Sequence, residues 1–254
     1  MKLHAFYFSP TGGTKKVLNT ILSVWDCEKR YIDFADKTIS FENILFEEND
    51  FCIVAVPSYS GRVPQFITPM LQKLKGNGTK AILITTYGNR AFDDTLIELK
   101  NTLEFSGFLC VAGLAAVTQH SVMPKYGAGR PDLNDIEELK IFAQKIKNSI
   151  AYATTSVNVP GNVPYRKYLS IPIKPKANKL CNECGLCLRR CPVNAISASK
   201  IHTVDRNKCI SCLQCITICP RQARHVSKPI QRLAEIKMKK LCESKKSNYL
   251  YLVE

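Results

Sequence analysis

Five short apolar runs, separated by stretches of helical periodicity, organise the first 155 residues. We predict a β-strand at each run, and the runs cover residues 2–8, 29–34, 51–56, 80–86 and 108–117. Apolar residues recur every three or four positions between the runs, which predicts helices at 14–25, 64–74, 92–105 and 132–152. Strands that alternate with helices indicate an α/β domain with a doubly wound parallel sheet, which we place at residues 1–155.

The pattern changes after residue 155. Residues 156–178 are rich in proline and basic residues and show no periodicity, as expected of an extended linker. Residues 179–227 hold most of the cysteines and few apolar residues, which predicts a second, smaller α+β domain without an ordinary core. Residues 228–254 form a basic tail with rough helical spacing. We interpret the tail as a helix that covers a domain surface, with a membrane-surface helix as the alternative.

Charge is distributed unevenly between these parts. The whole chain has a formal net charge of +15, but residues 1–155 carry only +1 and residues 156–254 carry +14. Such a basic part attracts acidic proteins, most strongly at low salt, so we expect acidic redox-partner proteins. No nucleic-acid motif accompanies the charge, and we expect no nucleic acid as a partner. No apolar run is long enough to span a bilayer and none resembles a signal peptide, so we expect a cytoplasmic protein.

Eight of the twelve cysteines form two runs with one spacing. The runs begin at Cys181 and Cys209, and each reads C-x2-C-x2-C-x3-C-P. This spacing is typical of two [4Fe–4S] clusters, whereas zinc sites use cysteines in pairs and a third at this distance does not suit one tetrahedral ion. Among the other cysteines, Cys52 and Cys110 lie in apolar runs and are interpreted as buried free thiols.

The doubled run resembles the bacterial-type ferredoxins. This resemblance implies that the fourth cysteine of each run ligates the cluster of the other run. The first cluster would then be held by Cys181, Cys184, Cys187 and Cys219, and the second by Cys209, Cys212, Cys215 and Cys191. Because the two ligand sets interlock, we expect one folding unit whose clusters supply much of its stability.

A turn rich in hydroxyl and glycine residues follows the first predicted strand. It contains Ser9, Thr11, Gly12, Gly13 and Thr14, and a helical pattern starts at its end. The backbone N–H groups of a helix N-terminus and nearby hydroxyls bind phosphate. No lysine stands in a G-x4-G-K-[ST] frame, so a nucleoside triphosphate site is not indicated. The spacing [ST]-x-T-G-x-T resembles the FMN phosphate loop of flavodoxins; an ordinary capped helix start is the alternative.

Two further loops follow the third and fourth predicted strands. Both combine an aromatic residue, a glycine and polar donors, and their candidate flavin-binding residues are Ser58, Tyr59, Ser60, Gly61, Arg62, Thr86, Tyr87, Gly88, Asn89, Arg90 and Asp93. They resemble the ring-binding loops of flavodoxins, with Tyr59 as the first choice to stack on the flavin and Tyr87 as the second. In the flavodoxin-like strand order 2-1-3-4-5, FMN binds at the carboxyl ends of the strands, where these loops lie.

Arg62 and Arg90 depart from the acidic surroundings typical of flavodoxins. A cation near the ring would favour the reduced, anionic flavin and raise its potential. Pairing with Asp93 or Asp94 is the alternative. The irregular segment 118–131 starts at the same sheet edge and offers His120 and Tyr126 as further candidates.

Taken over nearly its whole length, the chain resembles the flavodoxin–ferredoxin fusion proteins called EFR-type ferredoxins. This resemblance implies two [4Fe–4S] clusters and FMN in one electron-transfer protein, which interconverts one-electron and two-electron transfer. The alternative is an FMN-dependent reductase of a small substrate, fed by the clusters. A docking module that has lost FMN is a third possibility, against which the intact phosphate loop argues. We find no nucleophile–base pair, so no catalytic residue is predicted.

Overall fold

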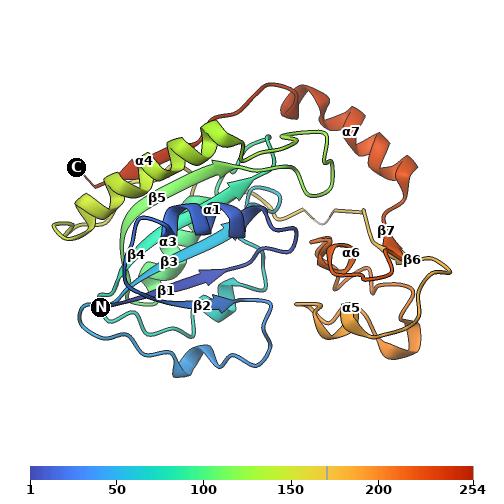
Figure 1. Cartoon of the computed structure of the whole chain (residues 1–254), viewed down its shortest axis with the longest axis horizontal. Helices are drawn as coiled ribbons and strands as arrows, with labels where there is room; N and C mark the ends of the chain where they lie inside the picture. Colours follow the sequence, from blue (N-terminus) through green and yellow to red (C-terminus); the bar gives the residue numbers. More distant parts are fainter. Residues whose placement is uncertain (170, 254) are drawn as a thin grey trace.

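The computed structural model describes residues 1–169 and 171–253. Residue 170, in the predicted linker, and residue 254, in the predicted tail, lie outside the described residues. Figure 1 shows an α/β unit followed by a small irregular unit and a long helix. The strands of the large unit are β1 (Lys2–Tyr7), β2 (Glu28–Asp33), β3 (Phe51–Pro57), β4 (Lys80–Tyr87), β5 (Leu109–Val117) and β8 (Tyr249–Leu252). Its helices are α1 (Gly13–Leu22), η1 (Phe41–Asn43), α2 (Thr68–Leu71), α3 (Thr95–Phe105) and α4 (Leu133–Ile150).

The sheet has the order β2-β1-β3-β4-β5-β8. Neighbouring strands from β2 to β5 are parallel, and β8 is antiparallel to β5. The order 2-1-3-4-5 of the parallel strands is that of the flavodoxin-like fold, so the predicted fold class is confirmed. The carboxyl ends of these five parallel strands therefore lie at one edge of the sheet.

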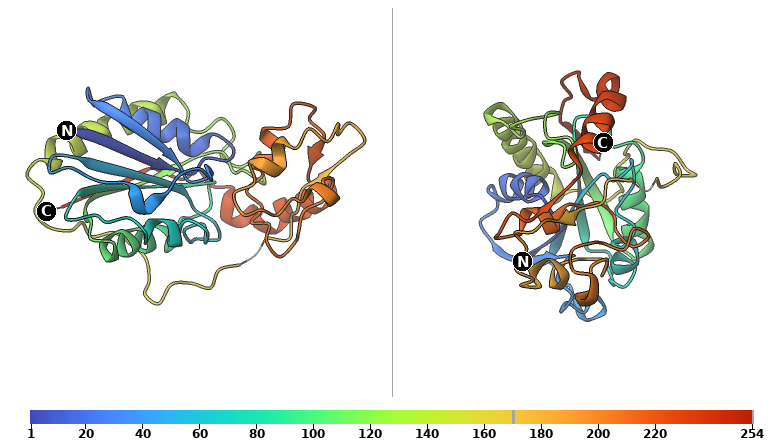
Figure 2. Two further views of the ribbon diagram at one scale, coloured as in Figure 1. Left: turned by 90° about the horizontal axis from the view of Figure 1, so that it is seen from below. Right: turned by 90° about the vertical axis from the view of Figure 1, so that its right-hand side faces the viewer.

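Both faces of the sheet are covered by helices (Figures 1 and 2). On one face, Leu18 of α1 and Leu139 of α4 pack on Ile53 and Ile84. On the other face, Leu99 of α3 packs in a cluster that also contains Phe6, Phe8, Val54 and Leu71. Strands buried on both faces are apolar throughout, which explains the continuous apolar runs in the sequence.

Two elements differ from the sequence prediction. The helix expected at 64–74 is reduced to the four residues of α2, because Pro69 occupies its first turn and lacks the N–H that a longer helix would need. The C-terminal residues 249–252, which we had assigned to the tail, form β8 at the edge of the sheet.

The small unit is built around the cysteine runs. Its elements are β6 (Lys176–Ala177), α5 (Leu186–Arg189), η2 (Ala198–Lys200), α6 (Gln214–Thr217) and β7 (Arg224–His225), followed by α7 (Lys228–Cys242). The antiparallel pair β6–β7 closes the unit. Each cysteine run ends in a one-turn helix, α5 or α6, preceded by a residue with positive φ, Gly185 or Leu213.

The helix α7 carries the chain back from the small unit to the sheet (Figure 1). It contacts the segment after β5: the Tyr126 hydroxyl donates to Glu235 O at 2.6 Å, and the Gln231 amide donates to Val122 O at 2.7 Å. The ammonium group of Lys125 lies 3.3 Å from the Glu235 carboxylate. In the described part of the chain, no helix combines the length and the apolar character needed to cross a bilayer.

A buried ion pair of the large unit holds the segment between α7 and β8, because Arg130 donates to Lys246 O and Asp135 accepts from Asn248. The guanidinium of Arg130 donates to the Asp135 carboxylate at 2.6 Å, and the Asn248 amide donates to Asp135 at 3.0 Å. Asn248 also accepts from the backbone N–H of Val117. Burial opposes ionisation of Asp135, but these hydrogen bonds and the Arg130 charge lower its pKa to about 2.

We expect Asp135→Asn to lower the free energy of unfolding by about 3 kcal/mol, because Arg130 stays buried without its counter-charge. Urea unfolding followed by circular dichroism measures this change. Glu137→Gln is the matched control, since its ion pair with Lys140 is exposed on the same helix and contributes less than about 0.5 kcal/mol. Equal effects of the two substitutions would contradict the role given to Asp135.

Candidate functional site

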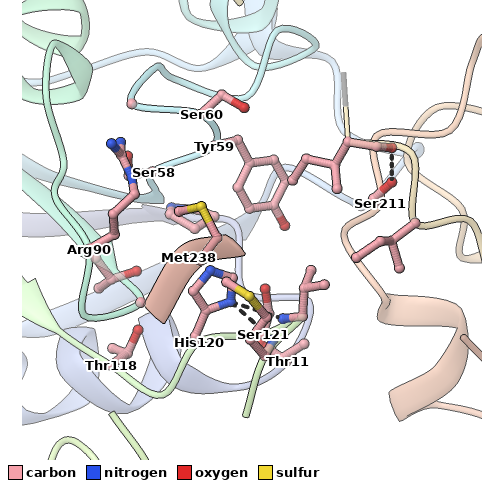
Figure 3. Close-up of a pocket in the computed structure, with 18 of the residues that line it drawn as sticks. Thr11, Ser58, Tyr59, Ser60, Arg90, Thr118, His120, Ser121, Ser211 and Met238 are labelled. Atoms are coloured by element: carbon pink, nitrogen blue, oxygen red, sulfur yellow. Dashed lines mark hydrogen bonds between the residues drawn. The ribbon is translucent and has the colours of Figure 1, made fainter. Parts of the chain in front are cut away.

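A cavity of about 420 Å³ lies at the carboxyl ends of β1, β3, β4 and β5. Figure 3 shows side chains from several segments turned toward this common space. Ser58, Tyr59 and Ser60 come from the loop after β3, and Arg90 comes from the loop after β4. The volume falls within the usual range for small-molecule sites, about 300–1,000 Å³.

The loop after β1 forms one end of the cavity. Thr11, Gly13 and Thr14 line it, and α1 begins at Gly13, so the helix N-terminus lies at this end. Gly12 has a φ of 90°, a conformation that glycine adopts without strain. The hydroxyl groups of Thr14 and Thr86 lie 2.8 Å apart, which ties this loop to the end of β4.

The loops after β3 and β4 form the walls. Ser58, Tyr59, Ser60 and Gly61 line the cavity from β3, and Thr86, Gly88 and Arg90 line it from β4. A Cβ atom at Gly88 would lie 2.7 Å from the Cα atom of His120, so a larger residue there would displace the next loop. The Tyr59 hydroxyl is buried and has no hydrogen-bond partner among the described residues.

Six predicted residues lie outside the lining. Ser9 and Gly12 lie within the first loop, where the Ser9 hydroxyl accepts from the backbone N–H of Lys15 at 2.8 Å. Arg62 is directed away from the cavity: its guanidinium donates to Glu98 at 2.7 and 2.8 Å and lies 4.8 Å from the centre of the Tyr165 ring. The structure therefore does not bring the Arg62 charge to the cavity.

The side chains of Tyr87, Asn89 and Asp93 are also engaged elsewhere. The Tyr87 hydroxyl donates to Ser247 O at 2.6 Å, and the Asn89 amide donates to Cys242 O at 2.6 Å. The Asp93 carboxylate forms ion pairs with Arg90 and Arg166. These residues fix the loops that form the walls, while Arg90 itself lines the cavity with its charge shared with Asp93.

A third loop, after β5, completes the walls. Thr118, His120, Ser121 and Met123 line the cavity, although the sequence offered only His120 from this set as a candidate. The His120 Nδ1 atom accepts from the backbone N–H groups of Val122 and Met123, both at 3.2 Å. Burial and the nearby Arg90 charge lower the pKa of His120 to about 4, so the ring is neutral at pH 7 with its proton on Nε2.

Segments far along the chain cover the cavity. Leu169, Ile171 and Ile173 come from the predicted linker, and Met238 and Leu241 come from α7. Ile210 and Ser211 come from the second cysteine run. The sequence predicted that a helix in the tail covers a domain surface, but it gave no signal that the linker and the second cysteine run take part or that this cavity is the surface they cover.

The eight cysteines of the two runs border two small cavities in the second unit. Cys181, Cys184, Cys187 and Cys219 border the first cysteine site, and Cys191, Cys209, Cys212 and Cys215 border the second cysteine site. The two groups are those that the resemblance to ferredoxins implies. In the described residues, no three His, Cys, Asp or Glu side chains are placed to hold a single metal ion.

The two cysteine sites differ in exposure. Cys184 of the first site is exposed, whereas Cys212 of the second is buried. Burial raises the pKa of Cys212 and Cys215 to about 12. For Cys219, burial acts in the same direction, but backbone N–H groups including those of Ala223 and Arg224 lower its pKa below the ordinary value.

Ile210 connects the second cysteine site to the large cavity. Its side chain belongs to the lining of both. Tyr59 and Ile210 also pack in the same apolar cluster as Cys212. Ile210 therefore forms part of the wall of both sites.

The comparisons with known proteins cover the two units separately. A model of the 4Fe–4S dicluster domain matches residues 180–223. Ferredoxin-2 of Chlorobaculum tepidum is 38% identical over 47 residues, which span 16% of this chain and 76% of that protein.

Solved structures resemble the first unit. A flavodoxin of Streptococcus pneumoniae TIGR4 has a TM-score of 0.44 and 18% identity, and the match covers 59% of this chain and 99% of that one. Rubredoxin oxygen:oxidoreductase of the anaerobe Desulfovibrio gigas has a TM-score of 0.46 and 21% identity. The match covers 59% of this chain but only 36% of that protein.

The strand order of the first unit and the cysteine runs of the second define an electron-transfer protein with an iron–sulfur domain. The chain belongs to the 4Fe–4S dicluster ferredoxins through residues 180–223, and it is a fusion of that domain with a flavodoxin-like domain.

Proposed function

We propose that this protein is an electron carrier that holds FMN and two [4Fe–4S] clusters and exchanges electrons with external redox proteins. The observation that carries the proposal is the shared wall at Ile210, which lines both the cavity and the second cysteine site. Clusters transfer single electrons, whereas a flavin accepts one or two. Two such sites with a shared wall suit the conversion between one-electron and two-electron transfer.

The lining of the cavity fits FMN. Thr11, Gly13 and Thr14 at the N-terminus of α1 would hold the phosphate, because helix N–H groups and hydroxyls donate to it. Tyr59 would lie against the ring, and the buried, unpartnered Tyr59 hydroxyl indicates a polar ligand at this place. When bound, the flavin supplies the two-electron chemistry.

The two cysteine sites fit iron–sulfur clusters. We propose the first site, with Cys181, Cys184, Cys187 and Cys219, and the second, with Cys191, Cys209, Cys212 and Cys215, as the ligand sets. A cluster bound by four thiolates carries negative charge, and a buried cation would stabilise it. Arg224 is such a cation: it borders the first site, is 3% exposed, and forms no ion pair with the described residues.

The surroundings of Cys184 favour an acidic partner protein. Cys184 is exposed, and so are Lys179 and Arg189, which lie near it in the sequence, and Arg221, which borders the same cysteine site. Positive charge around an exposed redox site steers negatively charged proteins toward it. The first cysteine site is therefore the proposed place of contact with external redox partners.

A reductase is the second candidate function. The cover formed by α7, Leu169, Ile171 and Ile173 favours a carrier, because it restricts access to the cavity. His120 favours a reductase, because a reductase needs a proton donor for its substrate. The loop after β5 fixes the Nδ1 atom of His120, which leaves the proton on Nε2 for this purpose (Figure 3). Oxidation of the reduced protein by a panel of small acceptors, compared with oxidation by an acidic redox protein, distinguishes the two.

We expect anaerobically purified protein to contain about eight iron, about eight sulfide and one FMN per chain. Cys184→Ser should lose at least half of the iron, because it removes a ligand of the first site. Cys27→Ser is the control and should keep the full complement, since Cys27 belongs to neither site. Colourless protein, or zinc in place of iron, would refute the proposal.

We expect Arg90→Gln to lower the midpoint potential of the bound flavin, because it removes a cation from the cavity wall. A decrease of roughly 30 mV corresponds to about 1.4 kcal/mol for a two-electron couple. Redox titration with the flavin absorbance as the signal measures it. Arg30→Gln, an exposed substitution on β2, should leave the potential unchanged; an equal shift in both variants would argue against a local effect of Arg90.

A further inference from the structure

The two cysteine runs continue in the same way beyond their fourth cysteine. The chain reads Cys-Pro-Val-Asn-Ala-Ile after the first run and Cys-Pro-Arg-Gln-Ala-Arg after the second. In each case the backbone N–H of the alanine donates to the Sγ atom of that fourth cysteine at 3.3 Å. The residue before each alanine has a φ near 50°: 52° at Asn194 and 50° at Gln222. Ile196 and Arg224 therefore occupy equivalent positions.

The two equivalent positions hold very different side chains. Ile196 is 6% exposed and borders the second cysteine site. Arg224 is 3% exposed and borders the first cysteine site. Burial of isoleucine is favourable, whereas burial of an unpaired cation is expensive. A guanidinium at this position therefore needs a negatively charged group beside it.

The hydrogen bonds of Arg224 leave part of its guanidinium unpaired. Its Nη2 atom donates to Ile201 O, while Nε and Nη1 are buried and have no partner among the described residues. Both Arg224 and Ile201 border the first cysteine site. Arg224 thus lines the first site and not the second, and two of its donors are free there, although its charge also acts on Cys215 of the second site.

We propose that Arg224 sets the redox potential of the first cysteine site, and makes a cluster held there easier to reduce than a cluster held beside Ile196. This inference rests on the proposed function. Uptake of one electron adds one negative charge to a cluster, and the guanidinium, which keeps its charge, stabilises the more negative state. Hydrogen bonds and charge near the cluster sulfurs are known means of raising its potential. Arg224 acts on the cluster through its charge and its hydrogen-bond donors, and it transfers no electron itself.

The consequence concerns the distribution of electrons within the protein. The second cysteine site shares Ile210 with the large cavity, and the first site includes the exposed Cys184. With Arg224 present, a single electron would reside at equilibrium on the outer site, where it is available to a docked partner. With isoleucine at 224, the difference in potential between the two sites would become smaller.

The test is a redox titration of the clusters in the parent protein and in Arg224→Ile, followed by electron paramagnetic resonance. We expect two separate reduction steps in the parent and convergence of the steps in the variant. At the potential where the first step of the parent is half complete, the ratio of reduced to oxidised cluster should fall at least tenfold in Arg224→Ile. Arg221→Gln is the matched control: Arg221 borders the same site but is exposed, so the ratio should change less than twofold.

Iron and sulfide contents are measured first, so that the outcomes are distinguishable. Parent protein without iron would refute the proposed function itself. A variant with full iron content and unchanged reduction steps would overturn only the role of Arg224. If Arg224→Ile does not retain its iron, Arg224→Gln decides, because it removes the charge but keeps polar donors: a fall of at least threefold in the ratio supports the inference, and an unchanged ratio overturns it.

Discussion

Attachment of the small unit at both of its ends is the constraint on which the rest of this structure depends. On the entering side, the backbone N–H of Val157 donates to Cys110 O at 2.7 Å, and the Asp94 carboxylate accepts from the backbone N–H groups of Asn162 and Arg166. On the returning side, α7 leads into β8, which pairs with β5. A unit fixed to the same sheet on both sides cannot move far from the carboxyl edge of the strands.

This double attachment explains why the cavity is built from both units. The flavodoxin-like unit supplies three loops at the ends of its strands, and the linker, α7 and Ile210 supply the cover. A flavodoxin-like domain alone would leave that side open to solvent. In the fusion, the cover also brings the second cysteine site to the cavity. The enclosure of the cavity and its proximity to that site therefore have one structural cause. The arrangement is visible in Figure 2, where the cysteine-containing unit lies at one end of the sheet.

The parts of this arrangement differ in how far sequence could predict them. The parallel sheet followed from buried apolar runs that alternate with helical patterns, whereas its strand order came from the resemblance to flavodoxins. The two cysteine runs follow from their spacing, and the grouping of their cysteines came from the resemblance to ferredoxins. Arg62, Tyr87, Asn89 and Asp93 looked like ligand-binding residues because they lie in the correct loops. A loop sequence does not show which side chains turn inward, and in these four cases partners such as Glu98 and Ser247, distant in sequence, direct them elsewhere.

The part that the linker and Ile210 take in the cover of the cavity, and the burial of Arg224, were beyond prediction for a related reason. Both depend on contacts between segments whose pairing is set by the tertiary fold and not by local periodicity. Arg224 also lies in a basic stretch, where an arginine is expected to be exposed. The structure shows instead that Arg224 is buried and borders the first cysteine site.

The most direct test of this account is a crystal structure of anaerobically prepared protein, with the iron atoms located by anomalous scattering. The account predicts FMN in the cavity between Thr14 and Tyr59, and two groups of iron atoms, with the Ile210 side chain between the flavin and the group held by Cys209, Cys212, Cys215 and Cys191. A cavity without flavin, or a flavin whose nearer iron group is held by Cys181, Cys184 and Cys187, would contradict it.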